Sequence, residues 1–284
     1  MSEETISHGQ SSQDMERWRE AGRRGRKLIE AKHRAASIKQ VVQDRGIKKL
    51  YHLTQARNLD SIFEHGILPR NELARRKIDA AFNSKLQCRE LADTVSVCIS
   101  GFNYEALHTL EQHKRERGET SPGDTLALLE LDSSVLYELS CSFFPTGAGV
   151  GLFRIEWETS YGAQALESMF EDGRPSPGGG YSRAKWDLKP WEVSDPNAEV
   201  FVFGAIPPRY IMCVLFKNGE QIDAYRSWVG NDGHIPYQIV THEAALFERR
   251  RDWLDWDISS MYAAVARERA ARRGGKNGGF RLVD

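Results

Sequence analysis

The 284-residue sequence predicts a single α+β domain with helical segments at its two ends. Two observations favour this fold class. Short apolar runs of strand length alternate with segments whose apolar residues recur at helical spacing, and two long polar stretches interrupt that pattern. An apolar content of 40% is enough for a sizeable core in a chain of this length.

The N-terminal segment is predicted to be helical and basic. Residues 14–45 contain no proline and are rich in Arg, Lys, Glu and Ala, with Ile38, Val41 and Val42 among the sparse apolar anchors. Residues 1–49 contain twelve Lys/Arg and seven Asp/Glu, a net charge of +5. We therefore assign residues 1–47 to a basic helical extension. It is either a solvated helix resting on the main domain or an arm that binds nucleic acid or a partner.

The first half of the main domain, residues 48–245, begins with a strand and a helix. KLYHLT at 49–54 predicts a short strand, and residues 56–66 predict a helix that Gly66 ends. A long, partly helical loop follows over 69–93, and a loop of that length in a compact domain is usually functional. Further predicted elements are strands at 94–100 and 125–132 and a helix at 104–115.

The second half contains another long irregular stretch, residues 145–196, which includes Trp186 and Trp191. Alternating apolar residues then predict a strand at 198–206, and a proline pair turns the chain into another strand at 210–216. A further possible strand spans 235–240. Residues 246–284 are expected to form a C-terminal helix and a basic tail.

Several protein classes have no support in the sequence. It contains no run of eighteen apolar residues and begins with a polar segment, so we expect a cytoplasmic protein without a membrane partner. Its four cysteines form no CxxC pair, which favours free thiols over a zinc site or disulfides. No Walker loop, HExxH or GxSxG motif occurs. The residues between the two basic ends carry a net charge of about −10. Electrostatic attraction for a polyanion would therefore come from the termini or from a local groove.

Two short motifs remain as candidates for chemistry. In LYHLTQARNLDSIFEHGIL, the polar His52 and Thr54 alternate along an apolar strand, and Asn58 follows on the next helix. In DPNAEVFVFGAIPP, Glu199 opens a strand directly after the long loop. Considered separately, His52 fits a structural histidine and Glu199 an exposed carboxylate at a strand end. The local sequence does not choose between these interpretations and a functional site.

Together, in this order, the motifs resemble those of the DarT family of ADP-ribosyltransferase toxins. Domains of that family begin with a Tyr-His-Phe-Thr-like strand and an Asn-Leu-x-x-Ile helix, and they end with a Gln-Ala-Glu-Val-like strand. The matching residues are Tyr51, His52, Leu53, Thr54, Asn58, Leu59, Ile62, Gly66, Asn197, Ala198, Glu199 and Val200. The segment SVCISGFNYEAL stands in the place of the family's central strand, and the resemblance runs from about Leu50 to Phe216.

The resemblance implies an ADP-ribosyltransferase fold, with two packed mixed β-sheets around an NAD⁺ cleft. It implies that His52, Thr54, Asn58 and Gly66 bind NAD⁺, which serves as co-substrate, and that no metal is needed. Glu199 and an arginine of the first loop would be catalytic; Arg89 is our choice, with Arg75 and Arg76 as alternatives. The second loop would shape the substrate site, where Trp186 and Trp191 either stack on an unpaired base or pack in the core.

The implied function is transfer of ADP-ribose from NAD⁺ to a base in single-stranded DNA, with thymidine as the favoured base. Such toxins are paired with a macrodomain antitoxin that removes the ADP-ribose, and a role in defence against phage is expected. Three alternatives stay open: a base in RNA, a guanine in DNA, or a non-catalytic module that binds nucleic acid. Modification of a protein is disfavoured.

The chemistry gives each implied residue a task. Positive charge develops on the ribose as nicotinamide leaves, so a fixed carboxylate such as Glu199 stabilises the transition state, binds a ribose hydroxyl and accepts the proton of the attacking base. His52 is expected to donate a hydrogen bond to a ribose hydroxyl, and the arginine to pair with a diphosphate oxygen or polarise the base. Long loops would exclude water.

Overall fold

The computed structural model describes residues 30–82, 91–101, 104–118, 121–145, 160–172, 175–176, 179–180, 183–195, 197–230 and 240–248. Within them lies a seven-stranded sheet of order β4-β7-β2-β1-β3-β8-β9. Neighbouring strands are antiparallel except β8 and β9, which run parallel. The strands are β1 (Lys49–Gln55), β2 (Thr94–Ile99), β3 (Leu126–Asp132), β4 (Cys141–Phe144), β7 (Glu199–Phe203), β8 (Ile211–Phe216) and β9 (Val240–His242). A two-stranded ribbon joins β5 (Pro175–Ser176) to β6 (Gly179–Gly180).

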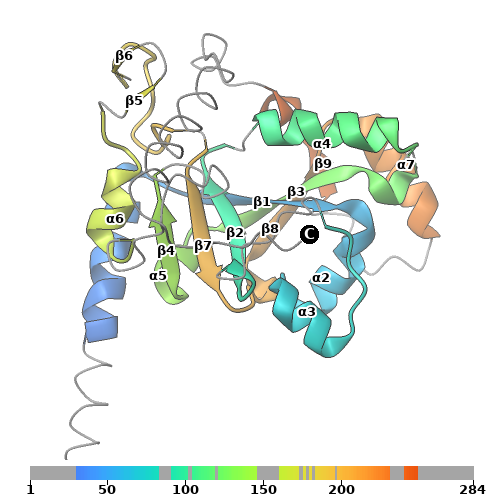
Figure 1. Cartoon of the computed structure of the whole chain (residues 1–284), viewed down its shortest axis with the longest axis horizontal. Coiled ribbons are helices and arrows are strands. Elements are labelled where there is room, and N and C mark those ends of the chain that lie inside the picture. Colours follow the sequence, from blue (N-terminus) through green and yellow to red (C-terminus); the bar gives the residue numbers. More distant parts are fainter. Residues whose placement is uncertain are drawn as a thin grey trace, which may run out of the picture.

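Helices flank this sheet, which confirms the predicted α+β class (Figure 1). The α-helices are α2 (Leu59–His65), α3 (Arg70–Arg76), α4 (Tyr104–Glu116), α5 (Val135–Glu138), α6 (Ala163–Ser168) and α7 (Gly219–Val229). Short 3₁₀ helices are η1 (Ala56–Asn58), η3 (Pro122–Asp124), η6 (Pro208–Tyr210) and η9 (Ala244–Phe247). A further helix covers residues 30–45 and precedes β1.

The sheet divides into two halves between β1 and β2. β1 pairs with β3 along its whole length, from Lys49↔Asp132 to Gln55↔Leu126. It pairs with β2 only at Leu50↔Ile99 and Tyr51↔Cys98. Beyond these pairs the strands diverge, and Figure 1 shows β2, β7 and β4 turning away from the direction of β1 and β3. The two sheets expected from the resemblance are thus halves of one hydrogen-bonded sheet.

The core explains why the strands read as apolar runs. In β3 every residue from Leu126 to Leu131 is buried, because alternate side chains enter two different hydrophobic clusters. The larger cluster, which we call the central core, also contains Ile38, Val41 and Val42 from the helix over 30–45. The described part of the N-terminal extension is therefore packed into the same core as the sheet.

Most of the elements predicted by periodicity are present, including the strands that carry the two motifs. The structure adds β4 and α6, which fall in or beside the stretch that the sequence marked as irregular, and α7 after β8. The expected strand at 235–240 is described only at Val240, where β9 begins, and the C-terminal helix lies outside the described residues. The division into residues 1–47, 48–245 and 246–284 remains a prediction.

Candidate active site at the division of the sheet

His52 lies on β1 where that strand separates from β2. Its Nδ1 is 2.8 Å from the backbone carbonyl oxygen of Ser96 on β2. A carbonyl oxygen only accepts hydrogen bonds, so Nδ1 carries a proton and donates it to Ser96. This bond spans the gap between the two halves of the sheet and fixes the plane of the imidazole.

The surroundings of His52 keep its ring neutral. Burial lowers the pKa of the imidazole, and the hydrogen bond to the Ser96 carbonyl offsets part of that shift. In a neutral ring protonated at Nδ1, Nε2 carries a lone pair and is an acceptor. The expectation that His52 donates to a ribose hydroxyl is therefore wrong for this arrangement: Nε2 can accept a hydrogen bond from that hydroxyl instead.

Glu199 is anchored by the same serine. The Ser96 hydroxyl donates to Glu199 Oε1 at 3.1 Å, which links the second strand of the site, β2, to the third, β7. The pairing of the strands accounts for this contact. Ser96 lies opposite Phe201, and Glu199, two residues before Phe201, points to the same face of the sheet. One residue therefore holds both motif residues, His52 through its carbonyl and Glu199 through its hydroxyl.

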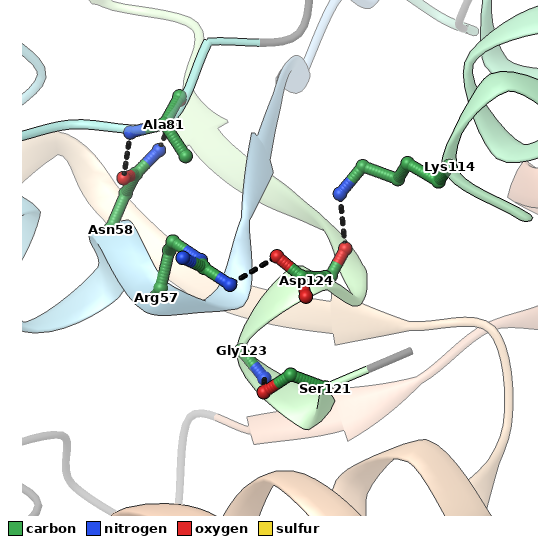
Figure 2. Close-up of polar contacts among 7 residues, drawn as sticks. All are labelled: Arg57, Asn58, Ala81, Lys114, Ser121, Gly123 and Asp124. Atoms are coloured by element: carbon green, nitrogen blue, oxygen red, sulfur yellow. Dashed lines mark hydrogen bonds and ion pairs between the residues drawn. The ribbon is translucent and has the colours of Figure 1, made fainter. Parts of the chain in front are cut away.

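Asn58 joins β1 to the first long loop. Its Nδ2 donates to Thr54 Oγ1 at 3.1 Å and to the Ala81 carbonyl at 2.8 Å, and its Oδ1 accepts from the Ala81 amide at 2.8 Å. Figure 2 shows Asn58 clamping both backbone groups of Ala81. Both side-chain N–H donors of Asn58 are thereby used. Asn58 and the buried Thr54 thus attach the first long loop to the end of β1. Their direct binding to NAD⁺ stays a prediction.

Beside Asn58, a charged cluster fixes the turn in which it lies. Arg57 and the buried Lys114 both bind Asp124, Arg57 at the carboxylate and Lys114 at the backbone carbonyl (Figure 2). The cluster ties η1 to η3 and to α4. The turn that carries Asn58 is therefore fixed by two contacts, one with Ala81 of the first long loop and one with Asp124 of η3.

Gly66 has a structural explanation. Its φ of 84° lies in the region that favours glycine, and its amide closes α2 by donating to the Ile62 carbonyl at 2.7 Å. A Cβ at this position would lie 2.4 Å from the backbone oxygen of Ile206. The predicted helix end is confirmed, whereas contact of Gly66 with NAD⁺ remains a prediction.

The arginines considered for catalysis fall into two groups. Arg89 lies outside the described residues. Arg75 and Arg76 lie at the end of α3, where Arg75 Nε and Arg76 Nε are 3.0 and 2.6 Å from the carboxylate oxygens of Glu72. These bonds use an exposed helix surface, so the alternatives to Arg89 are engaged in ion pairs within one helix.

The two predicted tryptophans occupy different environments. Trp186 is half-buried, with Lys185 Nζ 4.9 Å from its ring centroid. Trp191 is exposed and borders a pocket beside the beginning of β1. The structure therefore rules out core packing for Trp191, while base stacking by either residue remains a prediction.

Ser96 is the residue of the candidate site that the sequence did not reveal. Its signal was weak, because a serine in the mostly apolar strand TVSVCI is unremarkable by itself. Among the described residues, no group of three His, Cys, Asp or Glu side chains could hold a metal ion. No helix in the described ranges is long and apolar enough to cross a membrane. Cys98 and Cys141 are buried free thiols, and Cys213 is a partly exposed one.

No protein-family model matches the chain, and no curated protein matches it. Among solved structures, it is similar to Thermosipho africanus DarTG in complex with ADP-ribose, with 16% identity and a TM-score of 0.43, over 70% of this chain and 51% of that one. It thus spans about half the length of that protein. It is also similar to Thermus sp. 2.9 DarT in complex with NAD⁺, with 15% identity and a TM-score of 0.40, over 70% of this chain and 97% of that one. Thermus sp. 2.9 DarT in complex with ADP-ribosylated ssDNA gives 15% identity, a TM-score of 0.35 and coverages of 70% and 96%. The function is therefore inferred from the geometry of His52, Ser96 and Glu199.

Proposed function

We propose that this chain is an NAD⁺-dependent ADP-ribosyltransferase that modifies a base in single-stranded DNA, with thymidine as the favoured base. The observation that carries the proposal is the anchoring of His52 and Glu199 on one residue, Ser96, where the sheet divides. A carboxylate on β7 and a neutral imidazole on β1, both held by β2 between them, suit a reaction in which a sugar becomes transiently cationic. The proposed catalytic domain is residues 48–245.

In the proposed reaction, the bond between nicotinamide and C1 of the ribose breaks, and its electron pair leaves with nicotinamide. Positive charge then develops on the ribose, where the Glu199 carboxylate stabilises it. The attacking base nitrogen supplies the electron pair of the new bond to C1, and its proton passes to Glu199. A carboxylate can accept several hydrogen bonds at once, so the bond from Ser96 leaves capacity for a ribose hydroxyl.

His52 and the first loop serve binding in this proposal. The Nε2 lone pair of His52 accepts a hydrogen bond from a ribose hydroxyl of NAD⁺. The Asn58 clamp on Ala81 sets the start of the segment that would cover the dinucleotide and exclude water. Arg89, further along the same loop, is proposed to bind a diphosphate oxygen or the acceptor base.

The choice of a single strand follows from the chemistry of bases. In a duplex the reactive edge is paired, and extracting a base costs a few kcal/mol of pairing and stacking. The choice of DNA and of thymidine follows the resemblance of the motifs. The same resemblance leads us to propose a toxin that acts in the cytoplasm and in phage defence, whose product a macrodomain antitoxin removes.

The test replaces Glu199 by glutamine, which keeps the size of the side chain and removes its charge. Glu199→Gln is expected to lower transfer at least about 10²-fold, the typical effect of losing one electrostatic stabiliser, with NAD⁺ affinity in calorimetry largely retained. Transfer is read as the mass of one added ADP-ribose on single-stranded DNA, on the matching duplex and on RNA of the same sequence. Activity of the variant within a few-fold of wild type would refute the role of Glu199. Labelling of RNA alone would show that the protein modifies a base in RNA instead of DNA.

A further inference from the structure

A pocket lies beside the beginning of β1. Its volume is about 240 Å³, and Gly46, Lys48, Lys49, Tyr51, Ser100 and Trp191 are among the residues that line it. This space holds several water molecules and can admit a planar group. Of the residues in the two motifs, Tyr51 lines this pocket, whereas His52, Thr54, Asn58 and Glu199 are not among its lining residues.

The rim of this pocket is cationic. Lys48 and Lys49 are exposed. Lys49 pairs with Glu130, whose side chain is largely buried and whose Oε2 lies 2.9 Å from Lys49 Nζ. The ion pair between Lys49 and Glu130 leaves the charge of Lys48 at the rim. A lysine ammonium next to an aromatic surface suits a nucleotide, which carries both a phosphate and a planar base.

The ring of Trp191 is exposed to solvent, and the loop that carries it is held in place by hydrogen bonds. It is 45% exposed, yet its loop is fixed by Arg183, which donates to the carbonyl oxygens of Glu192 at 2.5 Å and Lys189 at 2.8 Å. The Val193 amide next to Trp191 donates to Ser100 Oγ at 3.1 Å, which attaches the loop to the end of β2. Because the loop is already ordered, stacking of a base on this ring would cost little additional entropy.

The ring also rests on the turn that leads into β1. A Cβ added at Gly46 would lie 3.9 Å from Trp191 Cε3, so the indole covers the backbone of that turn. Arg45, one residue earlier, donates to the Pro190 carbonyl at 3.4 Å. The tryptophan is therefore positioned by two segments that are far apart in the sequence.

The register of the sheet places this pocket near Glu199. Tyr51 lies opposite Cys98, and Cys98 shares a face of β2 with Ser96, whose hydroxyl binds Glu199. Tyr51 and Glu199 are thus two strand spacings apart on one face, roughly 10 Å at about 4.8 Å per spacing. That separation between strand backbones leaves room for the modified base beside Glu199 and for a neighbouring nucleotide of the strand at the pocket.

We propose that this pocket binds a nucleotide that flanks the modified one in single-stranded DNA, with its base stacked on Trp191 and its phosphate beside Lys48. The inference rests on the proposed function for the identity of the strand. It assigns the pocket to recognition of the substrate outside the reacting nucleotide, separate from binding of NAD⁺.

The experiment measures binding of a fluorescein-labelled 12-nucleotide DNA strand of mixed sequence by anisotropy, without NAD⁺. Trp191→Ala is expected to weaken binding about 5- to 150-fold, the effect of losing one stacked base, and Trp191→Phe to bind more tightly than Trp191→Ala. Lys48→Ala should reduce the slope of log affinity against log salt by about 0.7, the contribution of one phosphate contact on a single strand. Trp228→Ala is the matched control, because Trp228 on α7 is also 45% exposed and lies outside the pocket.

Thermal unfolding of each variant establishes that it is folded, and calorimetry with NAD⁺ separates the two ligands. Equal DNA affinities of Trp191→Ala and Trp228→Ala would overturn the proposal, as would a loss of NAD⁺ affinity in Trp191→Ala without a loss of DNA affinity. Failure of the wild type to bind the strand would overturn it too. If the strand binds through Trp191 but receives no ADP-ribose, the pocket stands and the proposed function fails. If ADP-ribose is transferred and Trp191→Ala binds the strand normally, the proposed function stands and the assignment of the pocket fails.

Discussion

Replacing Ser96 by alanine would separate the two anchors of the candidate active site. The substitution removes the hydroxyl that donates to Glu199 Oε1 at 3.1 Å. It keeps the backbone carbonyl that accepts from His52 Nδ1 at 2.8 Å. Glu199 should therefore lose its fixed position while His52 retains its orientation.

The size of the effect follows from the environment of this hydrogen bond. A hydrogen bond to a charged group contributes about 1.5–3 kcal/mol, and the lower part of that range applies because Ser96 and Glu199 are only partly buried. If about 1.5–2 kcal/mol of transition-state stabilisation is lost, the rate of transfer falls about 13- to 30-fold, at 1.36 kcal/mol for each factor of ten. The loss should appear in kcat, since the side chains proposed to bind NAD⁺ are unchanged.

The assay is the steady-state rate of ADP-ribose transfer to single-stranded DNA over a range of NAD⁺ concentrations. Ser142→Ala on β4 is the matched control, because Ser142 lies opposite Phe201 on the same face and its Oγ has no hydrogen-bond partner within the described residues. Removing such a buried hydroxyl should leave kcat unchanged and should not lower the free energy of unfolding. A wild-type kcat in Ser96→Ala would refute the positioning of Glu199 by Ser96.

Two further predictions concern stability. Gly66→Ala should lower the free energy of unfolding by about 3 kcal/mol or more, because its Cβ would meet the Ile206 oxygen in addition to the strain of a positive φ; Gly204→Ala, with a φ of 81° and open space around its Cβ, should lose only about 1–2 kcal/mol. Equal losses in urea denaturation would show that the contact with Ile206 is unimportant. Because the pKa of His52 is lowered in the folded state, its contribution to stability is present above the ordinary histidine pKa of about 6.5 and is lost as pH falls below it. The difference in unfolding free energy between wild type and His52→Gln should therefore shrink by up to about 1.4 kcal/mol for each pH unit below about 6.5, and parallel pH profiles would contradict the lowered pKa.

The strands that carry the motifs could be predicted because their signals are local. Alternation over Lys49–Gln55 and Glu199–Phe203 reflects the burial of one face of each strand, which any few residues of the pattern reveal. The strand β4 was missed because four residues next to a stretch rich in glycine and proline give too short a pattern. Its identity depends on pairing with β7, which lies more than fifty residues further along the chain.

The site was predictable only in part, for a related reason. Resemblance of the ordered motifs placed His52 and Glu199 together, but their common anchor depends on the register of β2 against β7, which a sequence pattern does not encode. Asn58 shows the converse problem. A polar residue in a motif can form hydrogen bonds with a ligand or with the protein backbone. The backbone partner of Asn58 is Ala81, twenty-three residues away, so the local sequence does not reveal it. The choice between donor and acceptor for His52 likewise required the position of the Ser96 carbonyl.

The divided sheet also bears on how such a protein could change its specificity. His52 and Glu199 are held by strand ladders and by Ser96, all within regular structure, whereas long segments connect α3 to β2 and β4 to β7. Insertions or substitutions in those segments would alter which molecules reach the site and leave the spacing of its central groups intact. The strands that hold His52 and Glu199 and the long connecting segments are different parts of the chain. Substrate specificity can therefore change in evolution while the reaction stays the same.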